Sequence, residues 1–146
     1  MKIYLDACSL QRPLDNKNQM RVALEAEAVL GVLALCEAGQ LELISSEVLA
    51  FEVGRTPQLS RREYGLEVLS KARTFVSLSQ AVADRARIFT AVGVKPLDVL
   101  HLASAEAAQA DYFCTCDDRF LKKGRGLPDL KTKIVSPVEL AEEFEP

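Results

Sequence analysis

Short apolar runs alternate with longer helical stretches along the whole chain, and this alternation constrains the fold more than any other feature. Five runs have the length and composition of buried strands, at residues 3–5, 41–44, 75–78, 111–115 and 133–135. Helices are expected between and after them, at residues 19–38, 46–52, 60–73, 80–92, 96–108, 117–123 and 137–144. Strands that alternate with helices favour a parallel sheet covered on both faces, which places the chain in the α/β class.

The length and composition fit an ordinary globular protein. The chain has 146 residues, and we expect residues 1–146 to form a single domain. Hydrophobic residues make up 49% of the chain and charged residues 27%, both near globular averages. Two interruptions stand out. Residues 12–16 are expected to form a loop because Pro13 breaks the pattern, and residues 124–126 contain two glycines and are expected to be flexible.

Four acidic residues lie at the ends of the expected elements, far apart in the sequence. Asp6 follows the first strand and Asp117 follows the fourth. If those strands are neighbours, both carboxylates emerge at the carboxyl edge of the sheet, where open α/β sheets bind their ligands. Glu52 borders the apolar face of a helix, and Asp98 lies in the first turn of a strongly apolar helix. Carboxylates gathered at one point repel each other, and Mg²⁺ or Mn²⁺ suits such an all-oxygen site.

Each of these acids also has a structural explanation. Asp6 can be a turn or capping residue, and either Asp117 or its neighbour Asp118 can cap the following helix. A carboxylate such as Asp98 is stabilised in a first helical turn by the helix dipole. An isolated glutamate such as Glu52 is usually a solvated surface residue. Asp117 comes first after the strand and is therefore the preferred ligand, with Asp118 in reserve.

Other polar residues accompany the acids. His101, three residues after Asp98, is either a donor or proton carrier beside the site or a core histidine. Basic side chains that suit contacts with a phosphate backbone are Arg119, Lys122, Lys123 and, nearer the start of the chain, Arg12. A solvated helix face explains this basic patch equally well.

Several functional classes are disfavoured. The net charge of −3 argues against a protein held on nucleic acid by bulk positive charge. The four cysteines form no C-x-x-C pair and there is one histidine, so no structural zinc site is expected. No P-loop is present. The first residues lack a signal-peptide stretch and the apolar run 23–36 contains two glutamates, so we expect a cytoplasmic protein with reduced thiols and no membrane span.

Four segments together resemble the motifs of the PIN domain, the family of metal-dependent ribonucleases that includes VapC-type toxins. They are residues 3–8, 46–52, 95–103 and 114–120, which contribute Asp6, Glu52, Asp98 and Asp117 respectively. The third, Lys95-Pro96-Leu97-Asp98-Val99-Leu100-His101-Leu102-Ala103, is the most specific of the set. The first departs from the family pattern, because Cys8 and Ser9 stand where many members carry asparagine and an aliphatic residue.

The resemblance implies a three-layer α/β/α fold with five parallel strands in the order 3-2-1-4-5. It also implies an endoribonuclease that uses Mg²⁺ or Mn²⁺, with the four acids as catalytic and metal-binding residues and Asp118, Thr115 and His101 in supporting places around them. A toxin of this kind has an RNA substrate, an antitoxin protein as partner and a homodimeric state. Two alternatives remain open: a PIN-like module that binds RNA or protein without cutting, and a housekeeping RNA-processing nuclease with no antitoxin.

Overall fold

The computed structural model describes residues 1–90, 93–127 and 129–145. Its strands are β1 (Lys2–Leu5), β2 (Glu42–Ser46), β3 (Thr74–Val76), β4 (Tyr112–Cys114) and β5 (Lys133–Val135). All neighbouring strands pair in parallel, in the order β3-β2-β1-β4-β5. The α/β class and the expected strand order are therefore confirmed, and β1 and β4 lie side by side in the middle of the sheet.

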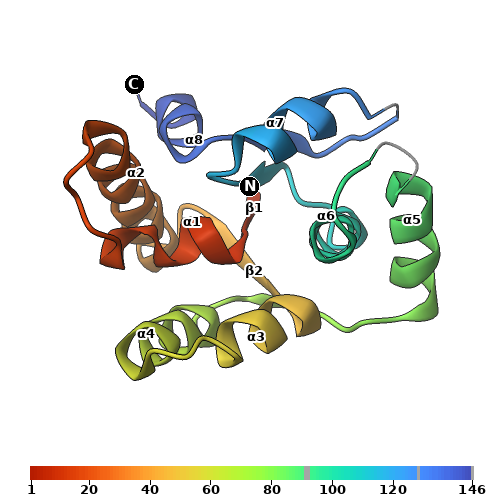
Figure 1. Cartoon of the computed structure of the whole chain (residues 1–146), viewed down its shortest axis with the longest axis horizontal. Coiled ribbons are helices and arrows are strands. Elements are labelled where there is room, and N and C mark those ends of the chain that lie inside the picture. Colours follow the sequence, from red (N-terminus) through yellow and green to blue (C-terminus); the bar gives the residue numbers. More distant parts are fainter. Residues whose placement is uncertain (91–92, 128, 146) are drawn as a thin grey trace.

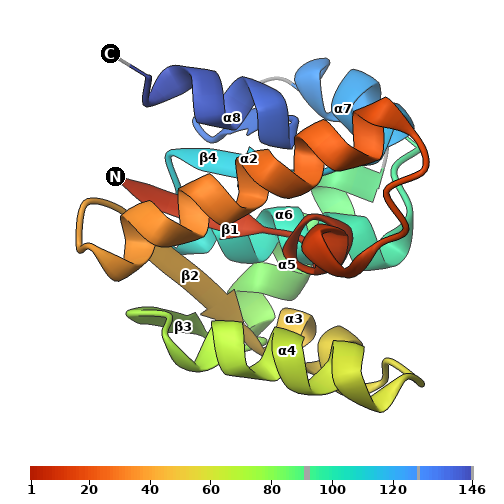
Figure 2. The same cartoon turned by 90° about the vertical axis from the view of Figure 1, so that its left-hand side faces the viewer.

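Helices occupy the connections, as parallel pairing requires. They are α1 (Ala7–Gln11), the short 3-10 helix η1 (Arg12–Leu14), α2 (Met20–Glu37), α3 (Glu47–Gly54), α4 (Leu59–Ser70), α5 (Gln80–Thr90), α6 (Pro96–Ala107), α7 (Asp118–Arg125) and α8 (Pro137–Glu143). Figure 1 shows α2 on one side of the sheet and α6 with α5 on the other. The perpendicular view agrees, with α2 in front of the sheet and α5 and α6 behind it (Figure 2). This is the expected three-layer arrangement.

The central strand β1 is buried on both faces of the sheet, which explains its continuous apolar sequence. Ile3, Tyr4 and Leu5 of β1 are fully buried, as is Phe113 on the neighbouring β4. A strand with helices on both faces has no solvated side, so its residues read as a continuous apolar run instead of an alternating one. Within the described residues, none of the helices has both the length and the apolar composition needed to cross a membrane.

The structure corrects two local expectations, one near the start of the chain and one at the end of α7. The segment expected to be a loop from Arg12 is largely the 3-10 helix η1, preceded by the unexpected helix α1. Gly124 and Arg125, expected to be flexible, form the last turn of α7. A Cβ atom on Gly124 would collide with the side chain of Ile134. The glycine is therefore there for close packing of α7 on β5, not for mobility.

Other boundaries differ by one to three residues, which is the normal scatter of helix and strand ends. Strand β3 begins at Thr74 and ends at Val76, before the expected end at residue 78. Of the helix expected over residues 80–92, the part to Thr90 is observed as α5, and residues 91–92 lie outside the described residues.

Candidate active site

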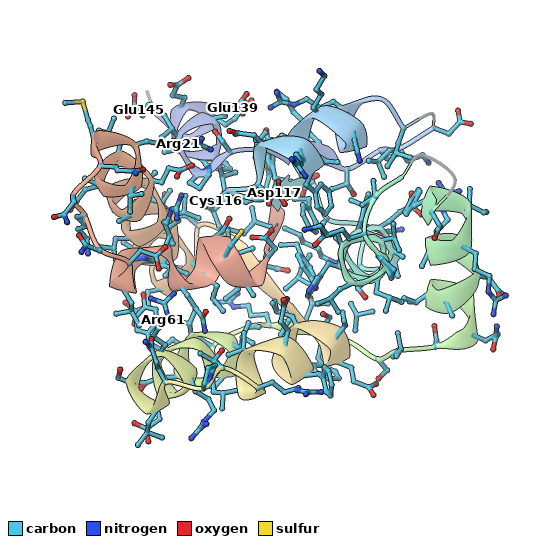
Figure 3. All side chains as sticks on the ribbon, in the orientation of Figure 1. Arg21, Arg61, Cys116, Asp117, Glu139 and Glu145 are labelled. Atoms are coloured by element: carbon cyan, nitrogen blue, oxygen red, sulfur yellow. The ribbon has the colours of Figure 1, made fainter. Side chains whose placement is uncertain are left out.

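One pocket at the carboxyl edge of the sheet brings the four predicted acids together. It has a volume of about 300 Å³ and is lined by Asp6, Ala7, Cys8, Glu52, Lys95, Leu97, Asp98, His101 and Asp117. The backbone N–H of Asp6 donates to the carbonyl of Cys114 on β4 (3.1 Å), so the ends of β1 and β4 are held together. Figure 3 shows Asp117 at the start of α7, facing the region of α1. The strand-end argument thus correctly placed Asp6 and Asp117 at one edge of the sheet.

Asp6 is both the N-cap of α1 and a wall of the pocket. Its Oδ1 accepts hydrogen bonds from the backbone N–H of Ser9 (3.0 Å) and from the Cys8 thiol (3.0 Å). Burial raises the pKa of Asp6, and the hydrogen bonds from Thr115, Cys8 and Ser9 oppose that shift. Cys8, the departure from the family pattern, therefore supplies a donor to the carboxylate. Thr115, one of the residues that the resemblance places around the acids, is among these donors to Asp6.

Asp117 has a comparable double role at the start of α7. Its Oδ1 accepts from the backbone N–H groups of Arg119 (2.9 Å) and Phe120 (3.3 Å), which makes it the N-cap. Its neighbour Asp118 is exposed, forms two short contacts with Arg21 (2.7 and 2.8 Å) and does not line the pocket. The choice of Asp117 over Asp118 as the pocket acid agrees with this placement.

Glu52 and Asp98 reach the pocket from two helices that contact each other, α3 and α6. Glu52 Oε1 lies 2.7 Å from Nε2 of His101, whose ring is buried. Asp98 is half-buried in the first turn of α6. Burial, followed by the charges of neighbouring groups led by Asp6, raises the pKa of Asp98 to about 6. A carboxylate perturbed in this way, in a cleft among other acids, is a functional-site candidate on physical grounds.

The chemistry of the donor set fits a hard divalent cation. Four carboxylates line the pocket, and burial first, then the charges of Asp6, Asp117 and Glu52, raise the pKa of Asp98. As the side chains stand, no three His, Cys, Asp or Glu residues of the described chain are close enough together to hold one ion. If a hard divalent cation binds here, its candidate ligands are Asp6, Glu52, Asp98 and Asp117.

The burial of Asp98 among other acids has a measurable consequence for stability. Because the folded protein raises the pKa of this acid from 3.8 to about 6, the folded state binds its proton more tightly than the unfolded state. The stability that this gives is complete below about pH 4 and is lost as the pH rises through about 6. At pH 7.5 in EDTA, Asp98→Asn should therefore raise Tm, by about 3 °C if solvent screening reduces the effect to roughly 1 kcal/mol.

Thermal unfolding at pH 4 and pH 7.5 checks this prediction. The gain should vanish at pH 4, and the exposed control Asp84→Asn should not reproduce it. An Asp98→Asn protein that is no more stable than wild type at pH 7.5 would show that neither burial nor the neighbouring acids destabilise the Asp98 carboxylate.

The predicted basic residues fall into two groups. Arg119 and Lys122 are exposed on α7, and the exposed Lys123 donates to the carbonyl of Gly93 (2.9 Å). Arg12 differs, because its guanidinium donates to Glu25 (2.7 and 3.1 Å) and to Asp15 (2.9 Å). Those bonds use one N–H of each nitrogen and hold the guanidinium against Glu25 and Asp15, so Arg12 has a structural role in the fold.

Lys95 is a pocket residue that the sequence reasoning did not single out. It lines the acidic pocket directly before α6, at the start of the most specific of the four motifs. The sequence signal that could have identified Lys95 as a pocket residue is its position immediately before Pro96 and three residues from Asp98. Tyr4 and Ser46 were also missed, and both connect to Glu52 through His101.

Comparison with known proteins places this geometry in a family. The sequence model of the PIN domain matches residues 3–126. No curated protein matches the chain in sequence.

Two solved structures share the fold. One is a chain of VapBC2 from Rickettsia felis bound to a DNA fragment from their promoter, at 12% identity and a TM-score of 0.60, covering 93% of this chain and 98% of that chain. The other is FitAcB from Neisseria gonorrhoeae, at 14% identity and a TM-score of 0.60, with 92% and 97% covered. At such identities the likeness concerns the fold, whereas the family match spans the four motifs and most of the chain: this protein belongs to the PIN domain family.

Proposed function

We propose that this protein is a metal-dependent endoribonuclease that hydrolyses RNA phosphodiester bonds. The observation that carries the proposal is the convergence of four carboxylates on one pocket in a chain of the PIN domain family, whose members are generally nucleases. Mg²⁺ or Mn²⁺ bound there would lower the pKa of a water ligand and offset the charge of the scissile phosphate. Asp6, Glu52, Asp98 and Asp117 are the proposed catalytic and metal-binding residues.

The other side chains of the site are proposed to bind and orient the substrate. Lys95 lies at the wall of the acidic pocket, where its ammonium group can contact a phosphate oxygen. The exposed basic side chains of α7 can contact the adjoining backbone; they are Arg119, Lys122 and Lys123. These contacts give affinity without reading the base sequence, so the choice of RNA rests on other features.

Cleavage of a panel of structured RNAs tests the proposal. The purified protein is incubated with Mg²⁺, with Mn²⁺ or with EDTA, beside an Asp6→Asn, Asp98→Asn double variant. Cutting that needs the metal and is absent from the variant supports the nuclease. Cutting that persists equally in EDTA or in the variant contradicts it.

Lys95→Ala should weaken substrate binding more than it slows the chemical step. Loss of one exposed charge contact of about 1 kcal/mol corresponds to an approximately fivefold rise in KM for RNA. The control is Lys71→Ala, an exposed lysine on another part of the surface that pairs with Glu37. Steady-state kinetics at two salt concentrations would show it, since the effect should shrink as salt screens the charge. An unchanged KM would remove Lys95 from the substrate site.

We further propose that the nuclease is the toxin of a type II toxin–antitoxin pair, a cytoplasmic homodimer neutralised by an antitoxin protein. One structural neighbour is a complex described as VapBC2 bound to promoter DNA, and the four cysteines here are all free, as in a reducing compartment. Co-expression with the product of a small adjacent open reading frame, followed by co-purification, tests the pairing. If cells that express the protein without this second product grow normally, the housekeeping nuclease is favoured.

One observation favours a second candidate, a PIN-like module that binds RNA or protein without cutting. Three of the acids already have partners in the protein: Asp6 and Asp117 cap helices, and Glu52 contacts His101. A non-catalytic chain could keep all three for those structural reasons. Asp98 distinguishes the candidates: among the described residues its carboxylate caps no helix and has no hydrogen-bond or ion-pair partner, and burial together with neighbouring acids raises its pKa.

A further inference from the structure

A chain of hydrogen bonds leads from the interior of the protein to Glu52. Ser46 Oγ lies 2.7 Å from the hydroxyl of Tyr4, which lies 2.6 Å from Nδ1 of His101. Nε2 of His101 lies 2.7 Å from Oε1 of Glu52. Ser46, Tyr4 and His101 are buried, and only the last member is partly exposed, at 34% of its side chain. The chain therefore joins β2, β1, α6 and α3 and ends at the pocket.

The hydrogens of this chain can be placed from the partners of each group. The Glu52 carboxylate only accepts, so Nε2 of His101 carries a hydrogen. Ser46 Oγ already accepts from the backbone N–H of Leu49 (3.1 Å), and among the described residues its remaining partner is Tyr4. Its hydroxyl hydrogen must then go to Tyr4, which in turn donates to Nδ1.

The opposite direction leaves one group unsatisfied. If His101 donated from Nδ1 to Tyr4, then Tyr4 would donate to Ser46, and the Ser46 hydrogen would have no acceptor within the described chain. A buried donor without an acceptor is costly. Burial also raises the pKa of Tyr4, so the phenol keeps the proton that it donates. Donation therefore runs one way, from Ser46 through Tyr4 and His101 to Glu52.

Glu52 lies where a carboxylate needs such a donor. It is in the last turn of α3, which ends at Gly54. The negative end of the helix dipole disfavours an anion there. The charges of the other pocket acids act in the same direction. The N–H of His101 is the hydrogen bond that offsets both effects and fixes the side chain toward the pocket.

We propose that Tyr4, supported by Ser46, is a positioning residue of the active site: its hydroxyl holds His101 in the tautomer that presents Nε2–H to Glu52, and so fixes the Glu52 carboxylate as a metal ligand. Only the second part of this proposal, that Glu52 is a metal ligand, rests on the proposed function. The hydrogen placement and the hold on Glu52 concern the protein without metal.

The ring and the hydroxyl of Tyr4 have separate roles, which makes the proposal testable. The ring stacks on Phe113 with centroids 5.2 Å apart and meets His101 edge-on at 5.8 Å. Tyr4→Phe keeps those contacts and removes only the hydroxyl. Tyr112→Phe is the matched control, a tyrosine on the neighbouring strand β4 whose ring meets Phe144 and which is outside the hydrogen-bond chain.

The first readout is ¹⁵N NMR of the imidazole in untagged protein without metal. His101 is the only histidine of the chain, so its two ring nitrogens give unambiguous signals. Wild type should show a protonated Nε2 and an unprotonated Nδ1 that accepts a hydrogen bond. Tyr4→Phe should lose the hydrogen bond to Nδ1 and shift the Nδ1 signal, whereas Tyr112→Phe should keep the wild-type signals. A wild-type ring protonated at Nδ1 would overturn the proposal without any variant having to fold.

The second readout is Mn²⁺ affinity by calorimetry, measured below Tm for every variant. Loss of a group that orients a metal ligand typically weakens binding about 10- to 100-fold, and Tyr4→Phe should fall in that range. Because Tyr4 acts through Glu52, adding Tyr4→Phe to Glu52→Gln should weaken binding no further. Additive losses, or equal losses in Tyr4→Phe and Tyr112→Phe, would mean a general structural role and refute the positioning role.

The two readouts separate this inference from the proposed function. Wild type that binds no Mn²⁺ and cuts no RNA would refute the nuclease and the metal-ligand half of the inference, while the NMR result would still decide the hydrogen placement. If wild type cuts RNA and Tyr4→Phe keeps both the wild-type Mn²⁺ affinity and the wild-type Nδ1 signal, the inference is refuted and the nuclease stands.

Discussion

Asp6→Asn and Asp98→Asn should each lower the rate of Mg²⁺-dependent RNA cleavage by about a hundredfold or more. Each substitution removes one anionic oxygen donor from the pocket that we propose to hold a cation. A metal's stabilisation of transition-state charge is worth several kcal/mol, and about 1.4 kcal/mol is tenfold in rate. Initial rates at saturating Mg²⁺ measure the loss directly.

The chain offers a close control for these substitutions. Asp118 has the same side chain and lies beside a pocket acid, but it is exposed and pairs with Arg21 (2.7 Å). Asp118→Asn should therefore keep nearly full activity. Asparagine is as good an N-cap as aspartate, so Asp6→Asn should keep α1 and the circular dichroism of wild type. An Asp118→Asn enzyme as inactive as Asp98→Asn would mean that the pocket is not the site.

Arg12→Ala should lower the free energy of unfolding by about 3 kcal/mol. This is the largest effect on stability that we expect from removing a single charged side chain. Its partner Glu25 is 3% exposed at the side chain, and removing one member of a buried pair leaves an uncompensated charge. The neighbouring Arg21 lies 3.6 Å from Glu25 and keeps the cost at the lower end of the usual 3–5 kcal/mol. Urea unfolding of both proteins gives the difference.

An exposed pair provides the comparison. Arg125 and Glu139 form a short ion pair with about half of each side chain exposed, so Arg125→Ala should cost at most about 1 kcal/mol. This experiment also tests Arg12 as a candidate RNA contact. Arg12→Ala could instead lower the free energy of unfolding as little as Arg125→Ala and raise KM for RNA. In that case the Arg12 side chain separates from Glu25 when it binds phosphate, and its role in the fold is minor.

The sequence predicted the fold through features that are local and periodic. Short apolar runs and helical spacing identify strands and helices without knowledge of their partners, and alternation of the two implies parallel pairing. Asp6 and Asp117 were placed at one edge because each follows a strand. Helix α1 was not predicted, because its five residues are too few to show a helical period. The cap that starts it depends on the rotamer of Asp6.

What the sequence could not predict depends on contacts between distant segments. Glu25 lies in an apolar helix with no local sign that Arg12 would pair with it. Tyr4 lies in a strand buried on both faces, where a tyrosine fits the pattern as well as an aliphatic residue. Its hydroxyl gains significance only when α6 brings His101 to within 2.6 Å. Lys95 likewise becomes a pocket residue only when α6 is packed against the sheet edge.

The central claim is that Asp6, Glu52, Asp98 and Asp117 form a metal centre. The most direct test is a titration of wild type and Asp98→Asn with Mn²⁺ at pH 7.5. Calorimetry or electron paramagnetic resonance gives the bound fraction without any choice of RNA. The account predicts saturable binding by wild type that is at least about tenfold weaker in Asp98→Asn, with no such change in Asp118→Asn. Wild type that binds no Mn²⁺, or that binds it equally well without the Asp98 carboxylate, would contradict the account.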